Sequence, residues 1–60
     1  MIVLIRNKKS GVEYIEKNVI AITLNDGHIE LIYDGDTNNE LYPLDSYEVI
    51  KIRKEKRNVD

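Results

Sequence analysis

Alternating apolar and polar residues predict that this chain is built from β-strands. In the segment 28–33 every second residue is apolar, so that Ile29, Leu31 and Tyr33 share one face. The segment 19–24 alternates in the same way, with Ile20, Ile22 and Leu24 on one face and Val19, Ala21 and Thr23 on the other. Because most of these residues are β-branched, we expect each strand to turn one face toward a core.

The tripeptide Asn25-Asp26-Gly27 separates these two runs and predicts a tight hairpin, because glycine adopts a positive φ without steric cost. The segment 1–6 is apolar on both faces and is expected to be a strand that is covered on both. The other expected elements are an extended piece at 12–15, strands at 40–44 and 49–53 (with Ile50 and Ile52 inward), turns at 7–11 and 34–39, and one helical turn at 45–48.

Five short strands joined by tight turns in 60 residues favour an all-β fold. We expect a small five-stranded barrel over residues 1–54, with one short 3₁₀ turn before the last strand, and a flexible charged tail at 55–60. The segment 41–50 resembles the fourth strand, 3₁₀ turn and fifth strand of an SH3-like barrel. This resemblance implies an architecture only, because the superfold does not carry a function. The Ala-Leu-Tyr-Asp-Tyr stretch and the paired tryptophans of peptide-binding SH3 domains are not present.

The composition argues against several classes of function. The chain has no cysteine and one histidine, so we expect neither a metal site nor a cofactor. Since a Gly-rich phosphate loop is also missing, we expect no catalytic residue and a protein that is not an enzyme. The longest apolar runs, 1–5 and 19–22, are shorter than the ~20 residues that span a bilayer, which favours a cytoplasmic protein without a membrane partner. Many Ile, Lys, Asn and Tyr residues, which have AT-rich codons, suggest a phage or a low-GC bacterium as the source.

The loop Asp34–Glu40 begins like an EF-hand, with oxygen-bearing side chains at the first, third and fifth positions. Asn39 stands at the sixth position, where an EF-hand needs glycine, and Asp45 stands at the twelfth, where it needs glutamate. We therefore expect a polar turn, and weak calcium binding stays open as an alternative.

Charge is unevenly distributed, with an acidic middle segment between basic ends. The acidic patch would consist of Asp26, Glu30, Asp34, Asp36, Glu40, Asp45 and Glu48. The basic patch would consist of Lys51, Arg53, Lys54, Lys56 and Arg57. The simplest interpretation is that opposite charges meet across neighbouring strands.

Three functions follow from these features, in order of preference. The first is a small protein-protein interaction module, an accessory protein of a phage or mobile element, which binds another protein or itself as a homo-oligomer. Its interface would be an apolar patch of Val19, Ala21, Thr23 and Ile32. The second is an acidic mimic of nucleic acid that inhibits a host protein. The third is a nucleic-acid-binding barrel that uses the basic patch, which the net charge of −2 does not favour.

Overall fold

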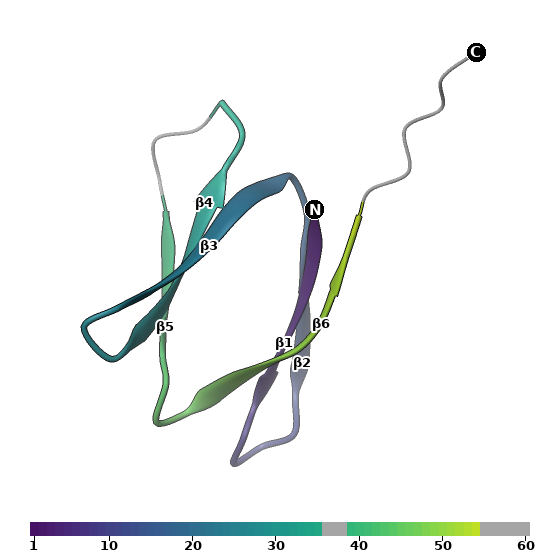
Figure 1. Cartoon of the computed structure of the whole chain (residues 1–60). Coiled ribbons are helices and arrows are strands. Elements are labelled where there is room, and N and C mark those ends of the chain that lie inside the picture. The colour runs from purple at the N-terminus through teal and green to yellow at the C-terminus, as the bar shows by residue number, and fades with distance from the viewer. Residues whose placement is uncertain (36–38, 55–60) are drawn as a thin grey trace.

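The computed structural model describes residues 1–35 and 39–54, which form β-strands and turns. The strands are β1 (Ile2–Asn7), β2 (Glu13–Glu16), β3 (Val19–Asn25), β4 (His28–Tyr33), β5 (Glu40–Pro43) and β6 (Tyr47–Arg53). They form two antiparallel sheets, in the orders β2-β1-β6 and β3-β4-β5, which face each other as the layers of a sandwich (Figure 1). The expected all-β class is therefore confirmed. The described part contains no helix, and hence none long and apolar enough to cross a membrane.

The expected five-stranded barrel is wrong, because the described residues form six strands in two separate sheets. The additional strand is β2, which replaces the short extended piece expected at 12–15 and pairs with β1. The expected 3₁₀ turn is not confirmed: residues 44–46 form a turn in which the Ser46 amide donates to the Pro43 carbonyl at 3.1 Å. The tail expected at 55–60 lies outside the described residues.

The hairpin between β3 and β4 confirms the turn predicted from the sequence. Asn25 pairs with His28, so that Asp26 and Gly27 form a two-residue loop. Their φ angles are 51° and 75°, and positive φ at both central residues is the mark of a type I′ turn. The Leu44 amide donates to the Gly27 carbonyl at 2.9 Å, so this turn also holds the connection between β5 and β6.

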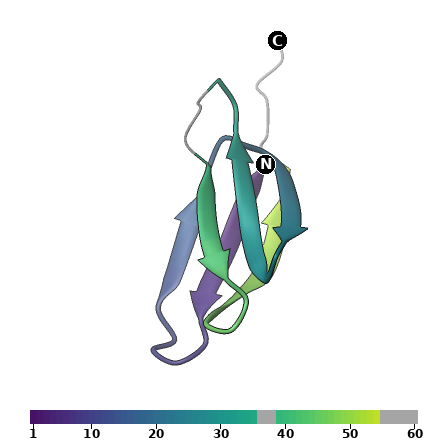
Figure 2. The ribbon, with the colours of Figure 1, turned by 90° about the vertical axis from the view of Figure 1, so that its left-hand side faces the viewer.

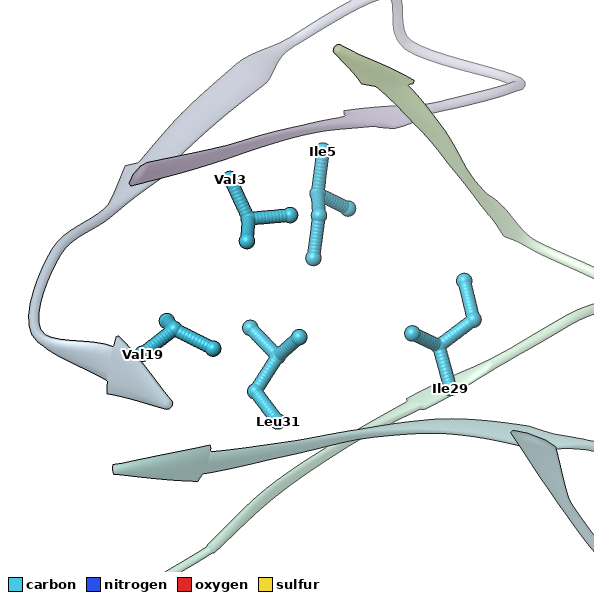
Figure 3. Close-up of a cluster of buried hydrophobic side chains, with 5 residues drawn as sticks. All are labelled: Val3, Ile5, Val19, Ile29 and Leu31. Carbon is cyan, nitrogen blue, oxygen red and sulfur yellow. The ribbon is translucent and has the colours of Figure 1, made fainter. Parts of the chain in front are cut away.

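The core between the two sheets is small. Val3 and Ile5 of β1 point toward Ile29 and Leu31 of β4, and Val19 of β3 completes the group (Figure 3). These are the fully buried side chains of the described residues, each with at most 1% of its surface exposed. A chain of this length buries a modest fraction of its unfolded surface, so a core of this size gives a narrow margin of stability.

Strand β3 does not follow the simple alternation that the sequence predicts. A register shift between Val19 and Ala21 marks a β-bulge, and it places Val19 in the core. Ile20 and Leu24, which were expected to face inward, are 57% and 73% exposed. Ile20 is exposed because the bulge shifts the alternation at the start of the strand. Leu24 is exposed because it lies beside the hairpin turn at the end of the sheet. Of the three residues expected to face inward, only Ile22 therefore packs against the core.

A second irregularity changes β6. The pairing of β1 with β6 shifts between Leu4 and Ile5, which leaves Ile50 without a cross-strand partner. Ile50, which was expected to be inward, is therefore 40% exposed. Ile52 does lie opposite the buried Val3 on the inner face, but it is near the end of this edge strand and is 55% exposed. Val49, opposite Ile5, packs against the core instead.

Strands β2 and β5 lie along the same side of the sandwich (Figure 2). A cluster of tyrosines closes this side. The hydroxyl groups of Tyr33 and Tyr42 donate to the two carboxylate oxygens of Glu16, the Tyr33 bond being 3.0 Å long. The ring of Tyr47 lies edge-on to Tyr42, with centroids 5.0 Å apart, and also contacts Tyr14 at 6.2 Å. Because Glu16 belongs to one sheet and its two donors to the other, this cluster ties the sheets together.

Candidate protein-binding surface

The outer face of the β2-β1-β6 sheet, which is turned away from the core, carries an apolar groove. On this face Leu4 of β1 lies between Ile15 of β2 and Lys51 of β6, and Ile2 lies opposite Arg53. The groove is lined by Ile2, Leu4, Ile15, Lys17, Lys51 and Arg53. It thus has aliphatic side chains along its centre and cationic side chains at its rim.

The groove exists because β1 is apolar on both faces. Val3 and Ile5 fill the core, so the alternation of the strand places Ile2 and Leu4 on the opposite face. The sequence led us to expect cover on both faces, but within residues 1–35 and 39–54 the outer face is uncovered, and Ile15 is 65% exposed. Aliphatic side chains grouped on an open sheet face are typical of a contact surface.

Charge along this face changes from one end to the other. The structure pairs none of Lys17, Lys51 and Arg53 with a carboxylate of residues 1–35 or 39–54. Beyond the groove, Arg6 lies between Glu13 and Glu48 and donates two hydrogen bonds to Glu48, at 3.0 and 2.8 Å. The cations at the groove are thus free to attract an anionic partner, whereas Arg6 is compensated within the chain.

The structure does not bring the expected apolar patch together. Val19 is buried, which corrects its expected place at the surface, and the reason is the bulge at the start of β3. Ala21 lies opposite Ile32 on the outer face of the β3-β4-β5 sheet. Next to them Thr23 donates a hydrogen bond to Glu30 at 3.3 Å, so the neighbourhood is polar. The three residues that remain at this surface offer little contiguous apolar area.

The expected acidic patch is spread over the molecule. Glu48 lies on the outer face of the β2-β1-β6 sheet, whereas Glu30 lies on the other sheet and accepts a hydrogen bond from Asn39 at 2.9 Å. The other described members are Asp26 in the β3–β4 turn, Asp34 in the turn after β4, Glu40 at the start of β5 and Asp45 in the β5–β6 turn. Asp36 lies outside the described residues. The described carboxylates therefore do not form one acidic surface.

The basic patch is found in part. Lys51 and Arg53 lie at the groove and Lys54 follows β6, while Lys56 and Arg57 lie outside the described residues. Sequence reasoning missed the aliphatic centre of the groove and its third cation, Lys17. The aliphatic centre could have been predicted from the second apolar row of β1, which contains Ile2 and Leu4.

The tyrosine cluster connects the two sheets through hydrogen bonds. Burial, followed by the hydrogen bond to the Glu16 carboxylate and its negative charge, raises the pKa of Tyr33 and of Tyr42. Both hydroxyl groups therefore stay protonated and act as donors between the sheets. Within residues 1–35 and 39–54 no group of three His, Asp or Glu side chains is placed to hold a metal ion. The polar turn predicted at Asp34–Glu40 includes residues 36–38, which lie outside the described residues, so neither this turn nor the alternative of weak calcium binding is tested.

Comparison with known proteins gives this chain no relative. No family model, no curated protein and no solved structure matches it.

Proposed function

We propose that this chain is a small, non-enzymatic protein-interaction module that binds a partner protein through the groove of the β2-β1-β6 sheet. The observation that carries this proposal is the aliphatic row of Ile2, Leu4 and Ile15 on an open sheet face, beside cations that pair with no carboxylate of the described residues. Burial of the aliphatic row would supply most of the affinity. The cations would speed association and fix the orientation of the partner.

The chemistry of the groove favours a peptide segment in which apolar side chains are flanked by carboxylates. Lys17, Lys51 and Arg53 would pair with the carboxylates, and the aliphatic centre would accept the apolar side chains. A single-stranded nucleic acid would need aromatic rings on which its bases could stack. The tyrosines of this chain are gathered on the β2–β5 side of the sandwich and do not line the groove.

A random peptide library, displayed in the presence of competitor DNA, would test the proposal against the immobilised full chain. We expect the enriched peptides to combine apolar residues with Asp or Glu. Lys51→Glu and Ile15→Ser should each weaken the best peptide by about tenfold, since rim charge and central apolar area each contribute on the order of 1 kcal/mol. Lys9→Glu is the matched control, because Lys9 is exposed in the β1–β2 turn and does not line the groove.

Two results would contradict the proposal. One is a set of enriched peptides whose binding is unaffected by Lys51→Glu and Ile15→Ser. The other is binding of a single-stranded oligonucleotide that is tighter than that of any peptide and is weakened by Lys51→Glu, which would favour the nucleic-acid alternative.

A further inference from the structure

The four edge strands of the sandwich are not equally protected against pairing with another chain. Edge strands of monomeric proteins usually carry charged residues or proline, which prevent further strands from adding to the sheet. Three of the edges do so, with Glu13 and Glu16 in β2, Glu40 and Pro43 in β5, and Glu48, Lys51 and Arg53 in β6. The fourth edge, β3, is seven residues long and contains neither a charged residue nor a proline.

The free edge of β3 is also accessible. Within residues 1–35 and 39–54, β3 pairs with β4 on one side, and on the other side only Val19 exchanges backbone hydrogen bonds, with Met1. From Ala21 to Asn25 the register with β4 is regular, so this part of the strand can accept a further partner. Ile20 and Leu24 are 57% and 73% exposed along it.

We propose that β3 pairs antiparallel with β3 of a second copy of this chain, joining the two β3-β4-β5 sheets across a two-fold axis. An alignment centred on Ile22 places Ala21 of each copy opposite Thr23 of the other and Ile20 opposite Leu24, so that no position of the paired strands brings two charges together. A second copy is the fitting occupant because an uncharged strand meets itself without repulsion. In β6 an alignment centred on Ile52 would place Lys51 of each copy opposite Arg53 of the other.

This pairing is independent of the proposed function. The groove lies on the outer face of the β2-β1-β6 sheet, whereas β3 is an edge of the other sheet. Both surfaces can therefore be occupied at once, and a dimer would present two grooves to a partner.

Sedimentation equilibrium of the full chain, from about 5 to about 500 µM, covers the range in which a small interface associates. We expect the wild-type chain to shift from monomer to dimer within this range. Leu24→Lys should remain monomeric, because it places an ammonium group opposite Ile20 at both symmetric positions. Since Leu24 is 73% exposed, the substitution should leave the fold intact, as measured by circular dichroism. The matched control is Leu41→Lys, which changes a leucine that is 56% exposed on the β5 edge of the same sheet and should dimerise like the wild type.

A wild-type chain that stays monomeric at every concentration would overturn this proposal. So would a dimer that survives Leu24→Lys, and in that case loss of the dimer in Ile15→Lys would identify the groove as the contact. If Leu24→Lys does not fold, Thr23→Lys provides a second charge on β3 at an exposed position. The two proposals fail separately, because Lys51→Glu should not change sedimentation and Leu24→Lys should not change peptide binding.

Discussion

The two open sides of the sandwich differ in the contacts that join the two sheets. On the β2–β5 side, Glu16 accepts hydrogen bonds from Tyr33 and Tyr42, so polar contacts within the chain tie the sheets together. On the β3–β6 side the sheets are joined near one end by the backbone bonds between Met1 and Val19. Along the rest of the β3–β6 side stand exposed aliphatic side chains, namely Ile20, Leu24, Ile50 and Ile52.

This difference suggests how a very small β-domain divides its apolar residues. The core holds five fully buried side chains, which is too few to account for all the aliphatic residues of the chain. Among the described residues, exposed aliphatic side chains lie on the β3–β6 side, as Ile20, Leu24, Ile50 and Ile52 do, and on the outer face of the β2-β1-β6 sheet, as Ile15 does. One side of the molecule therefore stabilises the monomer, and the other surfaces are available for contacts between molecules.

Alanine substitutions of two leucines on neighbouring strands would most directly compare the core with the β3–β6 side. Leu31 of β4 is fully buried and Leu24 of β3 is 73% exposed. Leu31→Ala should lower the free energy of unfolding by about 2–5 kcal/mol because it leaves a cavity in the core. Leu24→Ala should change it by less than about 0.5 kcal/mol. Urea denaturation, at a protein concentration low enough to keep the chain monomeric, would compare them, and equal losses would show that the β3–β6 side is packed.

A substitution in the tyrosine cluster should cause the next largest loss of stability. Glu16→Ala should lower the free energy of unfolding by about 1–2 kcal/mol, because it removes the acceptor of two partly buried hydroxyl groups. Glu13→Ala is the control, since Glu13 lies on the same strand but on the opposite face, and it should cost less than about 0.5 kcal/mol. Thermal unfolding of the two variants under the same conditions would measure this difference in stability. A Glu16→Ala variant as stable as Glu13→Ala would mean that the β2–β5 side does not depend on these bonds.

The sequence predicts the local features of this fold better than it predicts whether the strands close into a barrel. The Asp26-Gly27 turn was predicted because its geometry depends on two neighbouring residues that tolerate positive φ. The choice between a closed barrel and an open sandwich depends on how edges from distant segments meet, and alternation contains no such information. Two bulges, near Ile20 and Ile50, then moved aliphatic side chains from the expected interior to the surface.

The same limit applies to the groove. Lys51 and Arg53 belonged to the predicted basic patch because they are close in the sequence. Ile15 and Lys17 join them only because β2 and β6 flank β1 on opposite edges, which is a matter of strand order and register. The second apolar row of β1 was visible in the sequence, but whether another layer covers it could be decided only from the tertiary structure.

The smallest expected effect is a loss of stability at alkaline pH. The raised pKa values of Tyr33 and Tyr42 mean that the folded chain keeps both hydroxyl protons above pH 10.0, the ordinary value, where the unfolded chain loses them. The unfolded state then binds fewer protons, so stability should fall as the pH rises above about 10. Glu16→Gln removes the negative charge beside both hydroxyls, lowers both pKa values toward the ordinary value and should flatten this fall.

Urea denaturation at several alkaline pH values, together with the tyrosinate absorbance of the folded chain, would follow both effects. Glu13→Gln removes a charge from the same strand without touching the cluster, so it should keep the wild-type slope. If the slope survives Glu16→Gln unchanged, burial of the two hydroxyl groups, and not the charge of Glu16, raises their pKa values. The pH dependence thus separates the contribution of Glu16 from that of burial on the β2–β5 side of the sandwich.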